Sequence, residues 1–336
     1  MSEQNCMVFN CNVRGLNNLT RRKVVKDLVK DNSCTIVCLQ ETKLDYIDAQ
    51  VVLETLGPQF VDNFAYLPAQ QTRGGVLLAA HADYFTMGNE AVHENSVTMR
   101  LSAKTTLATW WITRVYGPQD DPAKLSFLQE LKEIAPLTED KWLVIGDFNL
   151  ILQAQDKSNS NLNRRLMGAF RATIDDLQLK EITLRGRKFT WSNNVTQTRI
   201  DRAFCTCDWD LMFPNCFLQA ISSVVSDHNP LILIGDYPRS KYRGFRFESF
   251  WPKISGYEEV VKEAWEKPVL VSNAFIRLHT KLQRTAKMLR VWAKSLIGPV
   301  KLQLVAARQL IWILDVVQEF RALSADEIAL KRDLKN

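Results

Sequence analysis

The segment Trp142-Leu143-Val144-Ile145-Gly146-Asp147-Phe148-Asn149 says more about the fold of this chain than any other. Residues 142–145 are apolar and partly β-branched, which is typical of a buried strand. Asp147 and Asn149 follow where such a strand would end, and residues two apart on an extended backbone project to the same side. The segment therefore predicts a buried strand with a carboxylate and an amide at its end.

Other short apolar runs of the chain also end in acidic, amide or imidazole side chains. These side chains are Asn12, Glu41, Asp201, Asp227 and His228. Because strand ends gather at one crevice in layered sheet proteins, residues far apart in sequence can share one site. Hard oxygen ligands together with one histidine suit Mg²⁺ and phosphate-ester chemistry.

Residues 1–236 alternate strand-like runs with a few amphipathic helices. We expect helices at residues 21–30, 121–134 and 166–177, and strands at residues 7–13, 35–39, 76–80, 96–101, 106–115, 142–146, 189–191, 200–204, 217–224 and 231–234. Strands distributed in this way must pair over long sequence distances. The pattern predicts an α/β (α+β) fold in which two β-sheets pack face to face and are flanked by helices.

Residues 237–336 differ in character and are expected to form a second, mostly helical unit. A helix is predicted at residues 257–266, and apolar residues at helical spacing predict two more, at 275–296 and 302–323. Gly298-Pro299 would separate these two into an antiparallel hairpin. The unit contains 19 Lys and Arg against 10 Asp and Glu, which favours a polyanion or an acidic partner; a solvated basic helix face is the alternative.

The composition disfavours several classes of protein. No apolar run reaches the roughly 18 residues that a membrane helix needs, and the first residues lack a basic region followed by an apolar stretch. We therefore expect neither secretion nor a membrane partner. The seven cysteines are expected as reduced thiols, and Cys205-Thr206-Cys207 has too short a spacing for a zinc finger.

Hydrolysis of a phosphodiester needs an aligned water and groups that offset the charge on the phosphoryl oxygens. Asp147 could orient the water while Asn149 donates to the phosphate, although an Asx turn explains this pair equally well. Glu41 suits a single-carboxylate Mg²⁺ site, because Mg²⁺ usually keeps several waters. A solvated surface charge is the alternative for Glu41.

A histidine can offset phosphate charge when a carboxylate keeps its ring oriented and charged. His228 is the candidate for this role, and Asp201 is its candidate partner; the alternative for His228 is a polar turn before a strand. Tyr116 could hydrogen-bond the phosphate, or could be a buried tyrosine with a backbone partner.

Six fragments occur in one order along the chain. They are Asn-Val-x-Gly-Leu from Asn12, Leu-Gln-Glu-Thr-Lys around Glu41, Tyr-Gly-Pro from Tyr116, Gly-Asp-Phe-Asn around Asp147, Ile-Asp-Arg around Asp201, and Ser-Asp-His-Asn-Pro around His228. Over about residues 5–235 this order resembles the endonuclease/exonuclease/phosphatase superfamily, which includes apurinic endonucleases and DNase I. The resemblance implies a four-layered α/β-sandwich of two mixed β-sheets flanked by helices, here with a C-terminal helical extension.

The resemblance also implies roles for individual residues in a Mg²⁺-dependent phosphodiesterase, with Mn²⁺ as a candidate substitute. Asn12 and Glu41 would hold the metal, with Asp227 on the metal side. Asp147 would align or deprotonate the water, Asn149 and Tyr116 would contact the phosphate, and Asp201 would orient His228. Two positions depart from the family pattern: Cys11 replaces a Trp, and Arg14 replaces an acidic residue of the apurinic endonucleases.

One branch of the superfamily is more similar than the rest. Residues 186–193, Gly-Arg-Lys-Phe-Thr-Trp-Ser-Asn, resemble the endonuclease domain of plant non-LTR (LINE-type) retrotransposons. Residues 245–251, Phe-Arg-Phe-Glu-Ser-Phe-Trp, resemble the segment that those polyproteins carry before reverse transcriptase. The basic side chains around the first segment are candidates for DNA contact: Arg164, Arg165, Arg185, Arg187 and Lys188.

We therefore expect a two-domain protein, with a catalytic domain at residues 1–236 and a basic helical extension at 237–336. The expected activity is a Mg²⁺-dependent DNA endonuclease that nicks one strand and leaves a 3′-hydroxyl, with DNA and, for the tail, element RNA as candidate partners. We expect a nuclear location, because the substrate would be chromosomal; the alternative is a cytoplasmic one. Two alternatives remain open: a phosphoinositide or sphingolipid phosphodiesterase of the same superfamily, and an inactive remnant that binds nucleic acid.

Overall fold

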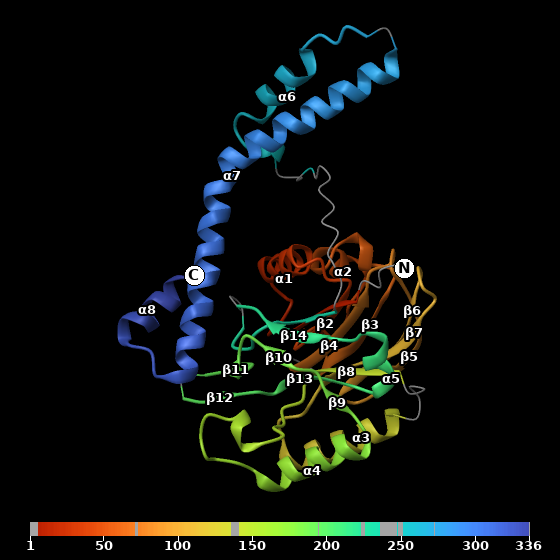
Figure 1. Ribbon diagram of the computed structural model, residues 1–336, viewed down its shortest axis with the longest axis vertical. Coiled ribbons are helices and arrows are strands. Elements are labelled where there is room, and N and C mark those ends of the chain that lie inside the picture. Colours follow the sequence, from red (N-terminus) through yellow and green to blue (C-terminus); the bar gives the residue numbers. More distant parts are fainter. Residues whose placement is uncertain are drawn as a thin grey trace. The chain divides into compact units, whose positions relative to one another are not determined.

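A computed structural model describes residues 6–70, 73–135, 141–193, 195–222, 226–235, 247, 251–271 and 273–335. The chain forms two compact units (Figure 1). The first comprises Met1–Tyr237 together with Trp312–Asn336, and the second comprises Pro238–Ile311. The C-terminal 25 residues thus belong to the first unit, whereas the domain division at residue 236 stays a prediction.

Among the described residues, the first β-sheet has seven strands in the order β10-β14-β15-β1-β2-β4-β3. Their bounds are β1 Met7–Asn12, β2 Ile36–Gln40, β3 Phe64–Gln70, β4 Arg73–Ala80, β10 Leu184–Arg185, β14 Phe217–Ala220 and β15 Leu231–Ile234. β1 pairs with β2 in parallel and with β15 antiparallel, so the sheet is mixed.

The second sheet, in the part of the chain that the structure describes, has six strands in the order β5-β6-β7-β8-β13-β9. They are β5 Phe85–Val92, β6 Ser96–Ala103, β7 Thr109–Tyr116, β8 Trp142–Asp147, β9 Lys180–Glu181 and β13 Asp201–Cys205. β7 and β8 run parallel, while β8 and β13 run antiparallel, so this sheet is also mixed. A separate hairpin is formed by β11 Trp191–Ser192 and β12 Gln197–Thr198.

Three buried clusters of apolar side chains separate four layers. The largest lies between the sheets and includes Val8, Leu78, Ile112 and Ile145. A second cluster packs the first sheet against α1 (Leu19–Asp31) and α2 (Ala49–Thr55), which is followed by a 3-10 turn at Pro58–Phe60. A third cluster packs the second sheet against α3 (Asp121–Ile134) and α4 (Arg164–Asp176). Figure 1 shows the two helix pairs on opposite sides of the sheets. The four-layered α/β-sandwich expected from the sequence is confirmed.

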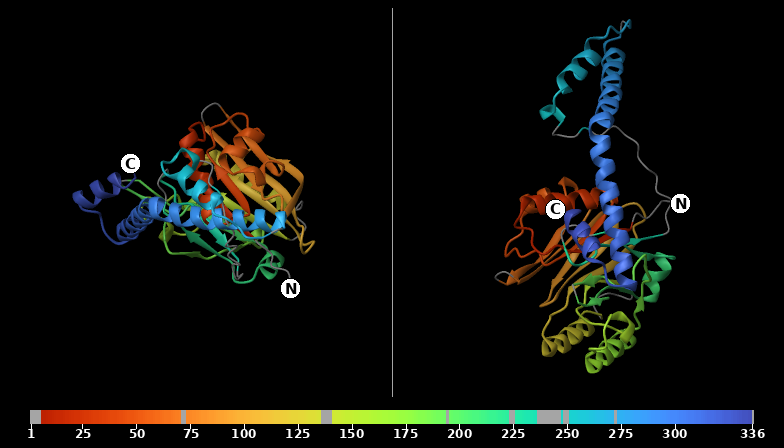
Figure 2. Two further views of the ribbon diagram at one scale, coloured as in Figure 1. Left: turned by 90° about the horizontal axis from the view of Figure 1, so that it is seen from above. Right: turned by 90° about the vertical axis from the view of Figure 1, so that its left-hand side faces the viewer.

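The remaining helices include one correction to the sequence-based expectation. They are α5 (Cys207–Met212), α6 (Tyr257–Glu266), α7 (Ala274–Phe320) and α8 (Ala325–Asp333), with 3-10 turns at Ala154–Asp156 and Trp251–Lys253. The antiparallel hairpin predicted at Gly298-Pro299 is wrong, because α7 is one continuous helix of 47 residues (Figure 2). An interior proline costs a helix about 3 kcal/mol. The remaining residues of this long helix offset that cost.

The chain instead reverses between α7 and α8. Ser324 caps α8 in a capping box: its hydroxyl accepts the Glu327 N–H, and the Glu327 carboxylate accepts the Ser324 N–H. The Lys331 ammonium of α8 contacts Asp315 and Gln318 near the end of α7. Of the aromatic segment at residues 245–251, only Phe247 and Trp251 lie among the described residues. No helix in the described ranges combines the length and apolar character needed to cross a bilayer.

Candidate active site

The ends of five strands from both sheets meet at one end of the sandwich. Asn12 ends β1, Glu41 follows β2, Tyr116 ends β7, Asp147 ends β8, and Asp201 begins β13. β13 runs antiparallel to β8, which puts its first residue beside the last residue of β8, in direct register.

A hydrogen bond joins the two sheets at this end. The Gln40 amide of β2 donates to Asp201 Oδ1 of β13 over 3.2 Å. Gln40 is completely buried and was not recognised from the sequence as a site residue. The two sheets therefore contribute to a single polar centre rather than to two.

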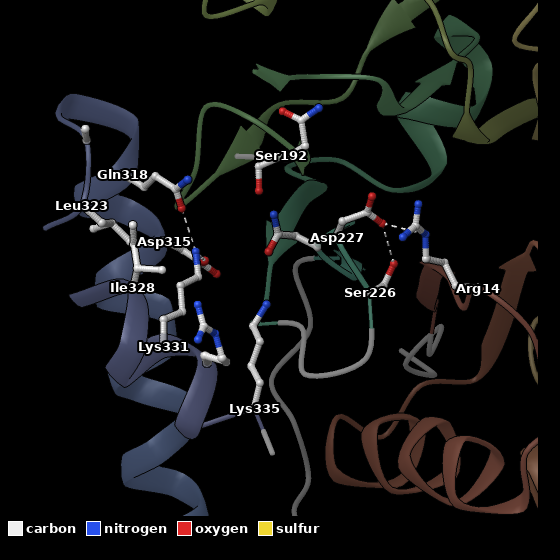
Figure 3. A pocket seen from close by; sticks show the side chains of 14 residues that line it. Arg14, Ser192, Ser226, Asp227, Asp315, Gln318, Leu323, Ile328, Lys331 and Lys335 are labelled. Carbon is white, nitrogen blue, oxygen red and sulfur yellow. Dashed lines mark hydrogen bonds and ion pairs between the residues drawn. The ribbon is translucent and has the colours of Figure 1, made fainter. Parts of the chain in front are cut away.

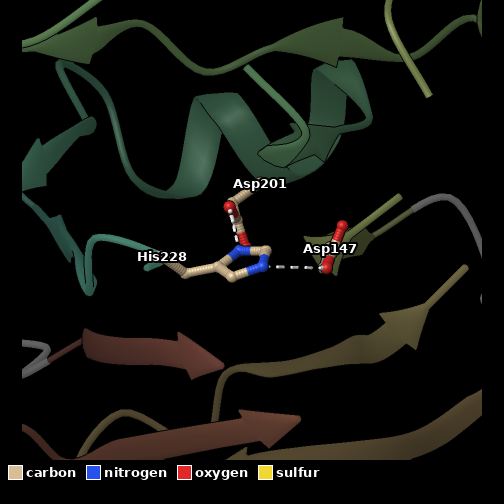
Figure 4. Close-up of side chains that lie close together, drawn as sticks. All are labelled: Asp147, Asp201 and His228. Carbon is tan, nitrogen blue, oxygen red and sulfur yellow. Dashed lines mark hydrogen bonds and ion pairs between the residues drawn. The ribbon is translucent and has the colours of Figure 1, made fainter. Parts of the chain in front are cut away.

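Asp147, Asp201 and His228 form the buried part of this centre, which we call the Asp–Asp–His cluster (Figure 4). His228 Nδ1 lies 2.9 Å from Asp201 Oδ2, and its Nε2 lies 3.8 Å from Asp147 Oδ2. One potential ligand atom from each residue lies within 4.8 Å of the others, so the cluster has the donor types and spacing of a metal site.

The protonation of His228 is governed by its carboxylate neighbours. Burial by itself would lower the pKa of the ring, but the charge and hydrogen bond of Asp201 overcome this effect and raise the pKa to about 9. Asp147 and Asp227 act in the same direction. His228 is therefore an imidazolium at neutral pH, and a protonated ring donates hydrogen bonds and does not bind a metal.

Asp147 is shifted toward a proton-accepting role. Burial and the nearby Asp201 carboxylate raise its pKa to about 7, although the His228 charge and the hydrogen bond from the Asn149 N–H oppose the change. The Asn149 N–H lies 3.0 Å from Asp147 Oδ1, as in the Asx turn that the sequence left open. The Asn149 amide also donates to the Gly117 carbonyl over 2.7 Å, so both the turn and the site geometry involve this residue.

A buried cation behind the cluster was missed from the sequence. Arg114 is fully buried on β7, and burial lowers its pKa to about 10, while the negative charges of Asp147 and Asp201 oppose the change. Its Nε and Nη2 atoms are buried without a hydrogen-bond partner among the described residues. An arginine within the apolar run Trp110–Val115 was the available signal, since charges on buried strands are costly unless compensated.

Glu41 lies at the centre of the second part of the site. The Asn12 amide donates to Glu41 Oε1 over 3.1 Å, and the Tyr116 hydroxyl donates to the same oxygen over 2.8 Å. Burial and the Glu41 charge raise the Tyr116 pKa, which keeps the phenol protonated. Glu41 Oε2 accepts no hydrogen bond from any described residue, and because Glu41 is partly exposed this oxygen can take a ligand. Glu41 also adopts a positive φ of 53°, so its conformation departs from that of the preceding strand.

Both carboxylate oxygens of Asp227, by contrast, already have partners. Its Oδ1 lies 3.0 Å from Arg14 Nε, and its Oδ2 accepts a 2.8 Å hydrogen bond from the Trp191 indole. Ser226 Oγ also lies 3.4 Å from Oδ1. Arg14 thus offsets the charge of Asp227. The geometry brings Asp227 close to the site but leaves it engaged.

The fit of the site to a divalent metal can be judged from these donors. Glu41 offers one open carboxylate oxygen, and Asn12 offers an amide oxygen that accepts the Arg14 N–H over 3.2 Å. Hard oxygen donors with room for water are what Mg²⁺ requires. In the Asp–Asp–His cluster a metal would have to displace the proton that Asp201 stabilises on His228. The residues therefore fit a divalent cation best at Glu41.

The five basic residues expected to contact DNA fall into two groups. Arg164 and Arg165 in the first turn of α4 are exposed, as are Arg185 and Lys188. Arg187 is different: its guanidinium is buried and contacts Asp315 over 2.8 Å and Glu319 over 3.2 Å. In this conformation Arg187 is not available to a phosphate.

Two comparisons show what this chain is related to. A model of the Endonuclease/Exonuclease/phosphatase family matches residues 7–228, which is most of the chain and includes every strand-end residue described above. The chain belongs to this family. Members of the family are metal-dependent hydrolases that act on phosphodiester bonds, and the expected enzyme class is thereby confirmed.

Solved structures of the same fold include two nucleases. The endonuclease domain of TRAS1, a telomere-specific non-LTR retrotransposon, matches with a TM-score of 0.52 and 15% identity, covering 70% of this chain and 100% of that one. An AP endonuclease from Archaeoglobus fulgidus matches with a TM-score of 0.52 and 15% identity, covering 69% and 100%. No curated protein matches the chain. At these identities the structural likeness establishes the family fold.

Proposed function

We propose that this protein is a Mg²⁺-dependent DNA endonuclease of LINE-type retrotransposon origin that nicks one strand and leaves a 3′-hydroxyl. The observation that carries the proposal is the pairing, at one end of both sheets, of a proton-accepting Asp147 with a protonated His228 and an open Glu41 carboxylate. DNA as the substrate is supported by the resemblance of residues 186–193 and by the nuclease activities named for the two structural neighbours.

Asp147 and His228 have complementary tasks in the proposed reaction. The ionised Asp147 accepts a proton from a water that attacks the phosphorus. Asn149 contacts the phosphate with the amide N–H that Gly117 does not take, and Tyr116 contacts it when its hydroxyl turns away from Glu41. The His228 imidazolium, held by Asp201, donates to a phosphoryl oxygen as negative charge develops there. The water oxygen binds phosphorus, the P–O3′ bond breaks, and O3′ takes up a proton from solvent water, which leaves a 3′-hydroxyl and a 5′-phosphate.

The metal is assigned to Glu41 and Asn12. A divalent cation there would offset charge on the phosphate and on the leaving oxygen, with Mn²⁺ able to replace Mg²⁺. Arg14 keeps Asp227 neutralised, so Asp227 supports the metal side without being a direct ligand. The exposed side chains of Arg164, Arg165, Arg185 and Lys188 would contact the DNA backbone.

Nicking of supercoiled plasmid tests the proposal. We expect relaxation with Mg²⁺ and none with EDTA, and a rate at least about 100-fold lower for Asp147→Ala and His228→Ala, because each removes a proton-transfer or charge-stabilising group. Glu41→Gln should raise the Mg²⁺ concentration needed for half-maximal rate.

Matched controls are Asp175→Ala on the exposed face of α4 and His279→Ala on α7, which should nick like the wild type. A folded wild-type protein that fails to nick DNA but hydrolyses phosphoinositides or sphingomyelin in liposomes would replace the DNA substrate by a lipid. Nicking that survives Asp147→Ala would contradict the assignment of the site.

A further inference from the structure

A cavity of about 800 Å³ lies within the first unit, between residues that flank His228 in sequence and the C-terminal helices (Figure 3). Asp227 lines the cavity, and the next residue, His228, belongs to the cluster. The wall on the sandwich side also includes Arg14, Ser192 and Asn229. The cavity therefore adjoins the segment that carries His228.

The opposite wall is formed by the end of α7 and by α8 with the residues after it. It presents Gln318, Leu323 and Ile328 together with the basic side chains Lys331, Arg332 and Lys335. None of these wall residues belongs to the strands and loops that carry the proposed catalytic groups.

A buried network of charges holds this wall in place. Arg187 Nη1 lies 2.8 Å from Asp315 Oδ2 and 2.6 Å from Asn229 Oδ1, and Arg187 Nε lies 3.2 Å from Glu319 Oε1. The Lys188 N–H donates to the Glu319 carboxylate over 3.1 Å. The Arg187, Asp315 and Glu319 side chains are 2%, 8% and 6% exposed, and charges buried so deeply require their partners. The docking of the wall is therefore specific.

The cavity carries an excess of positive charge. Four basic side chains line it against two acidic ones, and both acids are already paired: Asp227 with Arg14, and Asp315 with Arg187 and Lys331. Arg332 and Lys335 have no ion-pair partner in the described part of the chain. Desolvation lowers the pKa of Lys335, and the charges of Lys331 and Arg187 add to this decrease while Asp315 and Asp227 oppose it. An anion in the cavity would relieve this crowding.

The cavity is large enough, and has enough polar side chains, to bind a ligand larger than a free phosphate. Its volume lies within the roughly 300–1,000 Å³ typical of pockets for small molecules and cofactors. The polar side chains Ser192, Asn193 and Gln318 can hydrogen-bond a sugar or a base edge. Figure 3 shows Lys335 extending toward the side of the cavity where Asp227 lies, whereas Lys331 points to Gln318 and Asp315 on its own wall.

We propose that this cavity binds the nucleotide next to the scissile phosphate, and that Arg332 and Lys335 hold the phosphate of that nucleotide. The C-terminal segment 312–335 would thus complete the substrate site of the catalytic unit. The inference rests on the proposed function, because it specifies the part of a nucleic-acid strand that the same site engages. A lipid substrate has no neighbouring nucleotide that could occupy this cavity.

Metal-free binding of a dye-labelled DNA duplex, measured in EDTA by fluorescence anisotropy at several salt concentrations, tests this inference on the full chain. For Arg332→Gln/Lys335→Gln we expect about ten-fold weaker binding, and a slope of log Kd against log salt that is lower by about 2, since each lost phosphate contact removes about one unit. Both residues are accessible to solvent and neither has an ion-pair partner among the described residues, so the fold should be unaffected.

The matched control is Lys104→Gln/Lys141→Gln. Lys104 lies just beyond the end of β6 that is remote from Tyr116, and Lys141 precedes β8 at the end remote from Asp147. Both are exposed lysines, and this double variant should bind like the wild type. An equal loss in both double variants would reduce the effect to net charge and overturn the assignment.

A second readout separates this inference from the proposed function. Hydrolysis of bis(4-nitrophenyl) phosphate with Mg²⁺ should be unchanged in Arg332→Gln/Lys335→Gln, because this small diester does not fill the cavity, whereas DNA nicking should fall about ten-fold. Unchanged DNA affinity and nicking would overturn the cavity assignment while leaving the endonuclease intact. Weaker binding of phosphoinositide vesicles with unchanged DNA binding would also overturn it. If the wild type hydrolyses neither substrate, the proposed function fails, and the binding experiment still decides the cavity.

Discussion

Asp147 and His228 both hold their protons more tightly than usual, and the Asp201 carboxylate contributes to both shifts. Asp201 stabilises the proton on His228 by charge and by a 2.9 Å contact, and its negative charge also disfavours ionisation of Asp147. Arg114 limits the second effect by placing a buried cation near both carboxylates. Ionised Asp147 and protonated His228 therefore coexist between pH about 7 and about 9.

The first prediction concerns the pH dependence of nicking. The raised pKa of Asp147 means that activity rises as pH increases through about 7, and the raised pKa of His228 means that it falls through about 9. Asp201→Asn removes the charge that raises both pKa values, so both limbs should move to lower pH. The measurement is kcat/KM on a short duplex between pH 5 and 11. A profile that loses height without moving would assign Asp201 a merely structural role.

At the scale of single elements, β7 and β8 bring the buried cation to the carboxylates. Gly146 of β8 has a φ of 154°, and a Cβ built there would lie 2.1 Å from Arg114 Nη1 and 2.1 Å from the Val115 carbonyl oxygen. The missing side chain thus gives the Arg114 guanidinium its place beside the strand. The glycine of the Gly-Asp-Phe-Asn motif therefore has a packing reason, in addition to marking a strand end.

The second prediction tests this packing. Gly146→Ala should lower the free energy of unfolding by about 1–3 kcal/mol or more, because the new Cβ meets a backbone atom that cannot move aside easily. Gly168→Ala is the control: it lies in α4 with nothing within 4 Å of the added Cβ and should stabilise the helix by about 0.5–1 kcal/mol. Urea denaturation followed by circular dichroism measures both. Equal stabilities would remove the proposed packing role of Gly146.

Sequence patterns predict some strands and helices of this protein closely and miss others. Strands with continuous apolar runs, such as β1, β2, β8 and β15, were predicted to within about a residue, because burial on both faces leaves an unbroken hydrophobic signal. β3 and β5 were missed, since their half-exposed residues mix polar and apolar types without clear alternation. The 3.6-residue pattern likewise identified α3 and α6 but could not show that α7 continues past Gly298-Pro299.

At the scale of the whole molecule, the C-terminal 25 residues join the catalytic unit although most of the basic extension forms a unit of its own. The connection is made through Arg187, which the sequence suggested as a DNA contact. Buried carboxylates of α7 surround it instead, so its charge is used within the protein.

The third prediction tests whether Arg187 pairs with the carboxylates of α7 or contacts DNA. Arg187→Met should lower the free energy of unfolding by about 3–5 kcal/mol, because Asp315 and Glu319 would remain buried without their partner. Lys188→Met, at the adjacent exposed position, should change it by less than about 1 kcal/mol. Chemical denaturation measures both variants. Unchanged stability of Arg187→Met together with a lower salt dependence of DNA binding would restore Arg187 as a DNA contact.

The order of local motifs was readable from the chain alone, and with it the family, the layered sandwich and the strand ends at which polar residues occur. These features are encoded by neighbouring residues, since strand burial and turn chemistry depend on local pattern. The hydrogen bond from Gln40 to Asp201, the placement of Arg114 behind two carboxylates and the burial of Arg187 against α7 were not readable in this way. Each depends on contacts between residues far apart in sequence, whose energies arise only when the sheets and the C-terminal helices are packed together.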